Sequence, residues 1–210
     1  MNRMIKILMI SDILILTSFG LTDPIIAIFF KENLKGGTIL MAGLASTVYF
    51  VVKCAIQLPF SRYVDSHSDK ARMRWLILGS ILISATPFIY IFAEHVYVIF
   101  AAQVLHGIGS GLAYPTWLGL WSTHLDKKKE SFEWSLYSTL TGLGTATTAA
   151  VGAALSQFIG FTFAFTMVGT ISLTGSLMLL CLEKKRSKLN IAMETNYHKK
   201  RKLISGRHRT

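Results

Sequence analysis

The sequence is poor in charged residues and contains almost no cysteine. Only 16% of its 210 residues are Asp, Glu, Lys or Arg, and 51% are hydrophobic, which is unlike an ordinary soluble domain. The 2 cysteines, Cys54 and Cys181, both lie in apolar stretches, so we interpret them as small buried hydrophobic residues rather than a disulfide framework. No metal-ligand spacing occurs, and we expect neither a metal nor a cofactor. This composition predicts an integral membrane protein.

Acidic residues are also scarce, with 11 Asp and Glu against 22 Lys and Arg and a net charge of +11. Such an excess is found in proteins that bind nucleic acids, where basic side chains cover a soluble surface. Here the basic residues fall instead at the ends of apolar stretches. We therefore expect no nucleic-acid partner and explain the charge by membrane topology.

Long apolar runs are what the sequence has in abundance. Each has about the 17 to 25 residues that a bilayer requires, and the first is too long for a signal peptide and lacks a cleavage site. The runs cover approximately residues 5–30, 39–60, 75–92, 96–121, 135–158 and 161–182. We predict an all-α integral membrane domain of six transmembrane helices over residues 1–185. A basic, disordered cytoplasmic tail is expected over residues 186–210.

The basic residues give this topology an orientation. Of the 22 Lys and Arg residues, all except Lys31, Lys35 and Lys53 lie at the amino terminus, in the loops after the second and fourth spans, or beyond the sixth span. Because cytoplasmic loops carry the excess of positive charge, we predict a multi-pass protein of the plasma membrane with both termini in the cytoplasm. The basic residues of the tail either are solvated topology anchors or contact anionic lipid headgroups.

Two aspartates occupy the first span. Asp12 and Asp23 are eleven residues apart, which places both carboxylates on one helix face, and Pro24 should bend or open the helix after them. Acidic groups inside a membrane are costly and usually functional, so we expect both to line a substrate or ion cavity. The alternative is that they lie close enough to the membrane surfaces to be solvated.

A lysine lies within the second span. Lys53 shares a polar face with Gln57 and lies at a depth similar to that of Asp12, so we hypothesise an ion pair between Lys53 and Asp12. The alternative is a side chain that extends along the helix toward the headgroups. We expect Lys53 and Gln57 to line the same cavity as the aspartates.

The fourth span adds a second polar face, on which Gln103, His106 and Tyr114 align. His106 is either a packing residue or a proton carrier, and we expect all three to line the cavity. Trp117 and Trp121 are interpreted as an interfacial belt near the cytoplasm. The third span offers little to a cavity and is expected at the periphery.

Small residues mark expected helix interfaces. Gly107 and Gly111 form a pair that lets another helix approach closely. Gly142, Thr145 and Gly152 form a groove of small residues on the fifth span.

Four stretches of the chain resemble the major facilitator superfamily of transporters. Residues 19–24 and 43–46 are similar to the opening helices of that family. Ser61-Arg62-Tyr63-Val64-Asp65 occupies the place of the family's G-x-x-x-D-R-x-G-R-K loop, and residues 103–109 resemble its R-x-x-x-G-x-G pattern. The resemblance implies that Asp65, with the basic Lys70 and Arg72, forms a gating loop. Gln103 replaces the arginine that many members use for proton coupling, so the resemblance does not imply proton-driven antiport.

The resemblance also implies an assembly. Members usually have twelve spans in two similar halves, with the substrate between them and spans two and five at the junction. A chain of six spans therefore resembles a half-size transporter, which as a parallel homodimer would pass a small solute of unknown identity by alternating access. The alternative is a non-transporting assembly or regulatory subunit. We do not expect an enzyme, because no catalytic constellation is present.

Overall fold

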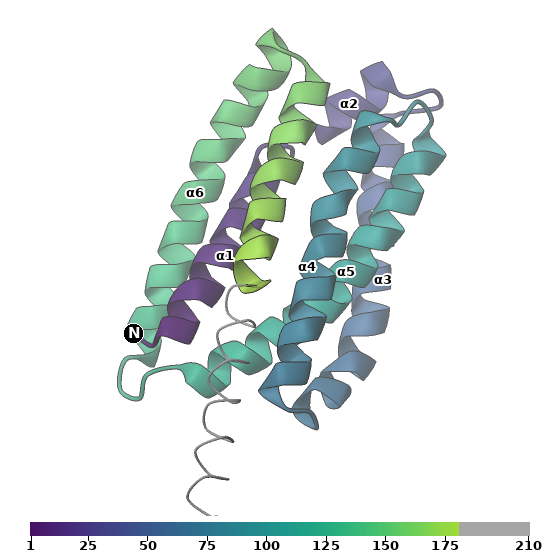
Figure 1. The fold of residues 1–210 in the computed structure, drawn as a ribbon. Coiled ribbons are helices and arrows are strands. Elements are labelled where there is room, and N and C mark those ends of the chain that lie inside the picture. The colour runs from purple at the N-terminus through teal and green to yellow at the C-terminus, as the bar shows by residue number, and fades with distance from the viewer. Residues whose placement is uncertain (181–210) are drawn as a thin grey trace, which may run out of the picture.

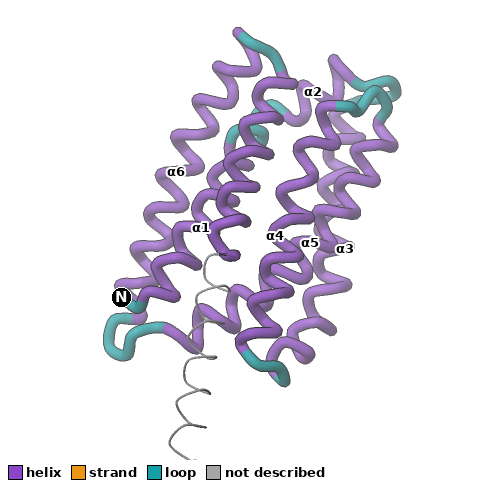
Figure 2. The backbone as a smooth tube through the Cα atoms, in the orientation of Figure 1, coloured by secondary structure: helices purple, strands orange, loops and turns teal. Residues whose placement is uncertain are grey.

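Helices make up most of residues 1–180, the part of the chain that the computed structural model describes (Figures 1 and 2). In chain order they are α1 (Arg3–Gly20), α2 (Ile26–Asn33), α3 (Ile39–Asp65), α4 (Asp69–Ile91), α5 (Val96–His124), α6 (Glu130–Phe158) and an unlabelled helix, Phe161–Leu180. Within residues 1–180 there is no strand apart from an isolated bridge between Lys35 and His95. The all-α class is as predicted. The predicted tail, residues 186–210, and the last predicted span residues, 181–182, lie outside the described residues.

Four of these helices are long and apolar enough to cross a membrane: α3, α4, α5 and Phe161–Leu180. The chain is thus a membrane protein, and four of the six predicted spans meet this requirement in the structure. α1 does not, because Arg3, Lys6 and Asp12 fall within its 18 residues. α6 does not either, because Ser, Thr and Gly dilute its apolar residues and its first turn is acidic.

The first predicted span is not one helix. α1 ends at Gly20, residues 21–25 form a turn, and α2 continues from Ile26. Pro24 has no backbone N–H to donate to the preceding turn, and a tighter turn forms in which the Thr22 N–H donates to the Phe19 carbonyl at 2.9 Å. The prediction that Pro24 opens the helix is confirmed, because the predicted span over residues 5–30 consists of two helices.

The other helices extend beyond the predicted apolar runs at one end of the bundle. That end carries Met1, the turn between α3 and α4, and the loop between α5 and α6 (Figure 1), and we name it the Met1 end. There α3 continues through Pro59 to Asp65, and α4 and α6 start before their apolar runs. Hydropathy marks only the part of a helix that needs hydrocarbon, so polar end turns escape it.

The helices form two groups. α3, α4 and α5 pack together on one side, and α1, α6 and Phe161–Leu180 on the other (Figure 1). α4 and α5 approach closely at Gly79, where an added Cβ would lie 2.6 Å from the Gly109 carbonyl oxygen. Phe161–Leu180 touches both groups, because Gly175 packs on the Ser11 carbonyl of α1 and Gly169 on Phe88 of α4.

Buried serines reinforce the contact between α4 and Phe161–Leu180. Ser84 lies 2.9 Å from Ser176, Oγ to Oγ, and Ser172 donates to Ser84. All three side chains are fully buried. Hydroxyls without partners are costly inside a bundle, so these bonds fix the two helices to each other.

α3 and α6 are the least covered long helices. Only 11% of the most apolar window of α3 is buried, against 50% for α4 and for α5. Its exposed large side chains include Leu44, Phe50, Val51 and Leu58. On α6 most residues between Ser138 and Phe158 are exposed or half-buried. Both helices therefore present apolar faces that the described chain does not cover.

Candidate functional site

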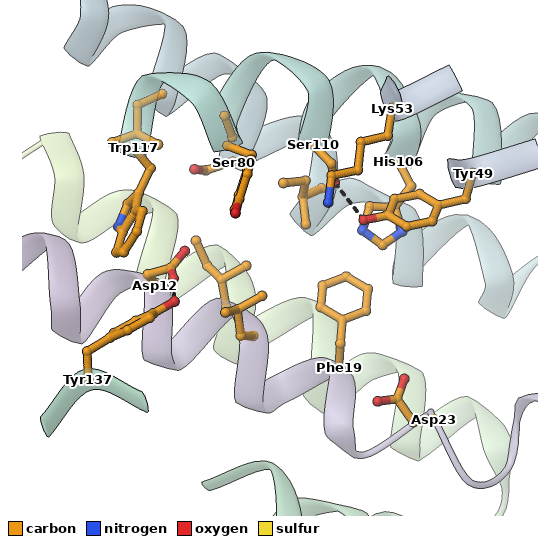
Figure 3. Close-up of a pocket in the computed structure, with 16 residues that line it drawn as sticks. Asp12, Phe19, Asp23, Tyr49, Lys53, Ser80, His106, Ser110, Trp117 and Tyr137 are labelled. Carbon is orange, nitrogen blue, oxygen red and sulfur yellow. Dashed lines mark hydrogen bonds between the residues drawn. The ribbon is translucent and has the colours of Figure 1, made fainter. Parts of the chain in front are cut away.

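A cavity of about 340 Å³ lies between the two groups of helices, and it is partly open (Figure 3). Its wall comes from α1, the turn after α1, α3, α4, α5 and α6. Five of the predicted site residues line it: Asp12, Asp23, Lys53, His106 and Tyr114. Positions far apart in the sequence, predicted from polar residues within apolar runs, thus meet around one space.

Asp12 and Tyr137 form one end of the cavity. The Tyr137 hydroxyl of α6 donates a hydrogen bond to Asp12 Oδ2 of α1, and both side chains are only partly buried (Figure 3). This bond supplies a partner for a polar group that hydrocarbon would not solvate. It also joins α1 to α6 beside the cavity.

Lys53 enters the cavity from α3, on the wall opposite α1 (Figure 3). Its Nζ lies 4.8 Å from the ring centre of Tyr114 and 5.9 Å from that of Tyr49, within range of cation–π attraction. The hypothesised ion pair with Asp12 is wrong, because Asp12 bonds to Tyr137 and no carboxylate within residues 1–180 lies within 4.0 Å of Lys53. The lysine projects into the cavity beside aromatic rings.

An aromatic stack forms the other end. The His106 ring of α5 lies 4.9 Å from Phe19 of α1 and 4.6 Å from Tyr49 of α3, between ring centres. Tyr49 also donates to the Ser110 hydroxyl at 3.4 Å (Figure 3). His106 therefore joins the two helix groups at a point where α1 and α5 otherwise touch little.

Two predicted cavity residues lie elsewhere. Gln57 borders a separate pocket between α3 and α5 toward the Met1 end, of about 320 Å³, whose wall also includes Asp65 and Gly119. It lies one turn beyond Lys53 on α3, past the level of the main cavity. Gln103 is half-buried on α5 and borders neither of these two pockets.

In the predicted gating loop, the carboxylate beside Arg72 belongs to Asp69 and not to Asp65. Arg72 donates to the main-chain oxygens of Val64, from Nε at 2.9 Å, and of Asp65, from Nη2 at 3.3 Å. Its carboxylate neighbour is Asp69, at 3.8 Å, and Asp69 in turn lies 3.6 Å from His124 Nε2 of α5. Asp65 thus offers Arg72 its carbonyl rather than its carboxylate. Lys70 is exposed at the start of α4.

The small residues divide between close packing and open surface. Cβ atoms added to Gly107 and Gly111 would lie 2.9 Å from the Tyr49 carbonyl oxygen and 2.8 Å from Ile56 Cβ, so both pack α5 on α3. Thr145 packs against Gly20, and Gly152 is buried on the backbone of Leu21. Gly142 is the exception. A Cβ atom added to Gly142 would meet nothing within 4 Å, because this residue lies on the uncovered face of α6.

Sequence reasoning missed several residues around the cavity. Leu76, Ser80 and Ile83 come from α4, the third predicted span, which is therefore not peripheral to the cavity. Trp117 lines the cavity and stacks on Trp121 at 4.8 Å, and both are buried, at 5% and 0% exposure. The interfacial belt expected for them is wrong. A tryptophan near the end of a span can lie either at the membrane surface or inside the bundle. Here the packing of α6 against Trp117 and Trp121 buries both of them.

Comparison with known protein families identifies the family to which the chain belongs. A family model described as Major Facilitator Superfamily matches residues 8–207, most of the chain. The chain belongs to the major facilitator superfamily, whose members are membrane transporters rather than enzymes. No curated protein matches the sequence significantly. Within residues 1–180 no three His, Cys, Asp or Glu side chains come together as metal ligands would.

Proposed function

We propose that the chain is one half of a transporter, and that two copies, parallel in the membrane, pass a small solute by alternating access. The observation that carries this proposal is the partly open cavity between the two helix groups, which brings Asp12, Lys53 and His106 together inside an otherwise apolar bundle. Ionisable groups at such a depth are costly to keep and usually serve transport.

The proposal includes six membrane crossings. α1 with α2, and α6, would complete the set begun by the four apolar helices. Of the ionisable residues in α1, Arg3 and Lys6 lie in its first turns, and Asp12 faces the cavity rather than lipid. On α6, the hydroxyls of Thr141, Thr147 and Thr148 bond to backbone carbonyls. Satisfied polar groups of this kind are compatible with a membrane helix. The distribution of basic residues supports a plasma-membrane protein with both termini in the cytoplasm.

The uncovered faces of α3 and α6 support the second copy as the partner. In the family these two spans lie at the junction between halves, and here both carry exposed small or apolar residues along their length. A two-fold axis would place α3 of one copy against α6 of the other and would enclose the open side of the cavity.

Reconstitution into liposomes tests transport. We expect the wild type to accumulate at least one solute from a panel of sugars, amino acids, organic cations and organic anions. Asp12→Asn should lower the initial rate about tenfold or more, because it weakens a hydrogen bond at the cavity wall. Lys35→Met is the matched control, since Lys35 lies in an exposed ion pair with Glu94. No flux together with capture of a different membrane protein would instead support an assembly subunit.

A further inference from the structure

Asp12 and Lys53, two charged side chains of the cavity wall, differ in the partners that they contact. Asp12 accepts a hydrogen bond from the Tyr137 hydroxyl, whereas within residues 1–180 Lys53 lies over the rings of Tyr49 and Tyr114 and has no ion pair. The ion pairs at the Met1 end and the pair between Lys35 and Glu94 lie outside the cavity. A cation in a low-dielectric site gains most from an anion that it can contact directly. Lys53 is therefore the charged group of the cavity that is best suited to contact an anionic solute.

The rest of the wall is mainly apolar and aromatic. Phe19, Tyr49 and His106 form a ring stack near Lys53, and Ile15, Leu16 and Ile83 also line the cavity. A volume of about 340 Å³ is at the small end of ligand pockets. Such a wall offers a solute rings and methyl groups to pack on.

We propose that the cavity binds small amphipathic organic monoanions, with the anionic group on Lys53 and an apolar or aromatic body against Phe19, Tyr49 and Tyr114. The proposal names the substrate class for the transport function proposed above and rests on it. A cationic solute would meet Lys53 as a like charge. Of the two carboxylates on the wall, Asp12 already accepts a hydrogen bond, and Asp23 lies on the turn after α1, at the Phe19 end of the cavity.

Three probes that share one body and differ in charge test this class. They are 4-phenylbutyrate, its neutral amide 4-phenylbutyramide, and the cation 4-phenylbutylamine. Binding is measured calorimetrically to the full chain in nanodiscs at pH 7, with empty nanodiscs subtracted. We expect the anion to bind at least about tenfold more tightly than the amide, as a charge-assisted contact in a shielded site requires, and the amine to bind more weakly than the amide.

Variants of Lys53 test whether this residue causes the preference for the anion over the amide and the amine. Lys53→Met should abolish the preference for the anion while the amide binds as before, which also shows that the variant is folded. Lys53→Arg should keep the preference because it keeps the charge. Lys35→Met, at an exposed position, should change nothing.

The outcomes separate this inference from the transport proposal. A Lys53-dependent preference for the anion without flux in liposomes supports the binding class and contradicts transport. Flux together with tighter binding of the amide or the amine overturns the binding class and leaves transport standing. Tighter binding of phenylalanine than of 4-phenylbutyrate would also overturn it, since it would assign the site to zwitterions.

Discussion

At the scale of single residues, the hydrogen bond from Tyr137 to Asp12 is the contact most open to test. Tyr137→Phe keeps the ring and removes the donor, so Asp12 is left without its partner at the cavity wall. We expect the free energy of unfolding to fall by about 1 to 3 kcal/mol. Chemical unfolding in mixed micelles measures it. Tyr97→Phe is the control, because Tyr97 is exposed, and an equal loss in both variants would contradict the role given to the bond.

The residues of the site were predictable to the extent that they stand out from an apolar background. Asp12, Asp23, Lys53 and His106 are conspicuous within membrane spans, and all of them line the cavity. Their partners were not predictable. Tyr137 is an ordinary residue near the start of α6, and only the packing of α1 on α6 makes it the donor to Asp12. Pairing across helices depends on rotation about each axis, which a single sequence does not encode visibly.

At the scale of helices, the glycines of α5 lead to a second prediction. Gly111→Leu would place a side chain against Ile56 on α3, and we expect this overpacking to lower the free energy of unfolding by about 1 to 3 kcal/mol. Gly142→Leu is the matched control because it makes the same change on the open face of α6. Steric-trap or denaturant unfolding measures the free energy of unfolding of the two variants. Equal stability would contradict the close approach of α3 and α5.

The end of α3 provides a third prediction. Arg72 donates to the carbonyls of Val64 and Asp65 at the C-terminus of α3, where the Val64 carbonyl also accepts from main-chain N–H groups of the following turn. Arg72→Met removes both bonds and should raise hydrogen exchange of the last turn of α3 about fivefold or more, equivalent to roughly 1 kcal/mol. Lys70→Met, on the exposed start of α4, should leave the exchange unchanged. Unchanged exchange in both variants would show that Arg72 does not hold this turn.

Helix positions were predicted well and helix ends poorly, for one physical reason. Apolar runs locate the part of each helix that needs hydrocarbon, and every predicted run falls largely within a helix of the structure. Ends are decided by local bonds instead, such as the Thr38 hydroxyl that accepts from the Met41 N–H at the start of α3. The break at Pro24 was visible because proline alters the backbone itself.

At the scale of the whole molecule, the proposed dimer predicts which faces meet. Cys54 on α3 and Gly142 on α6 are exposed, and each lies about three helical turns from the Met1 end of its helix. In a Cys181→Ala background, Gly142→Cys should give a dimer-sized product with a short bifunctional thiol reagent in membranes. Thr170→Cys, on the exposed side of Phe161–Leu180, should give none. A product at both positions or at neither would contradict this dimer.

The position of Phe161–Leu180 in the chain has a consequence for biosynthesis. This helix contacts both helix groups, through Ser172 and Ser176 to Ser84 of α4 and through Gly175 to Ser11 of α1. A ribosome releases it after α1 to α6, so the Ser11 hydroxyl is synthesised long before the Gly175 carbonyl to which it donates. We therefore expect the two helix groups to complete their packing only after translation has passed Leu180.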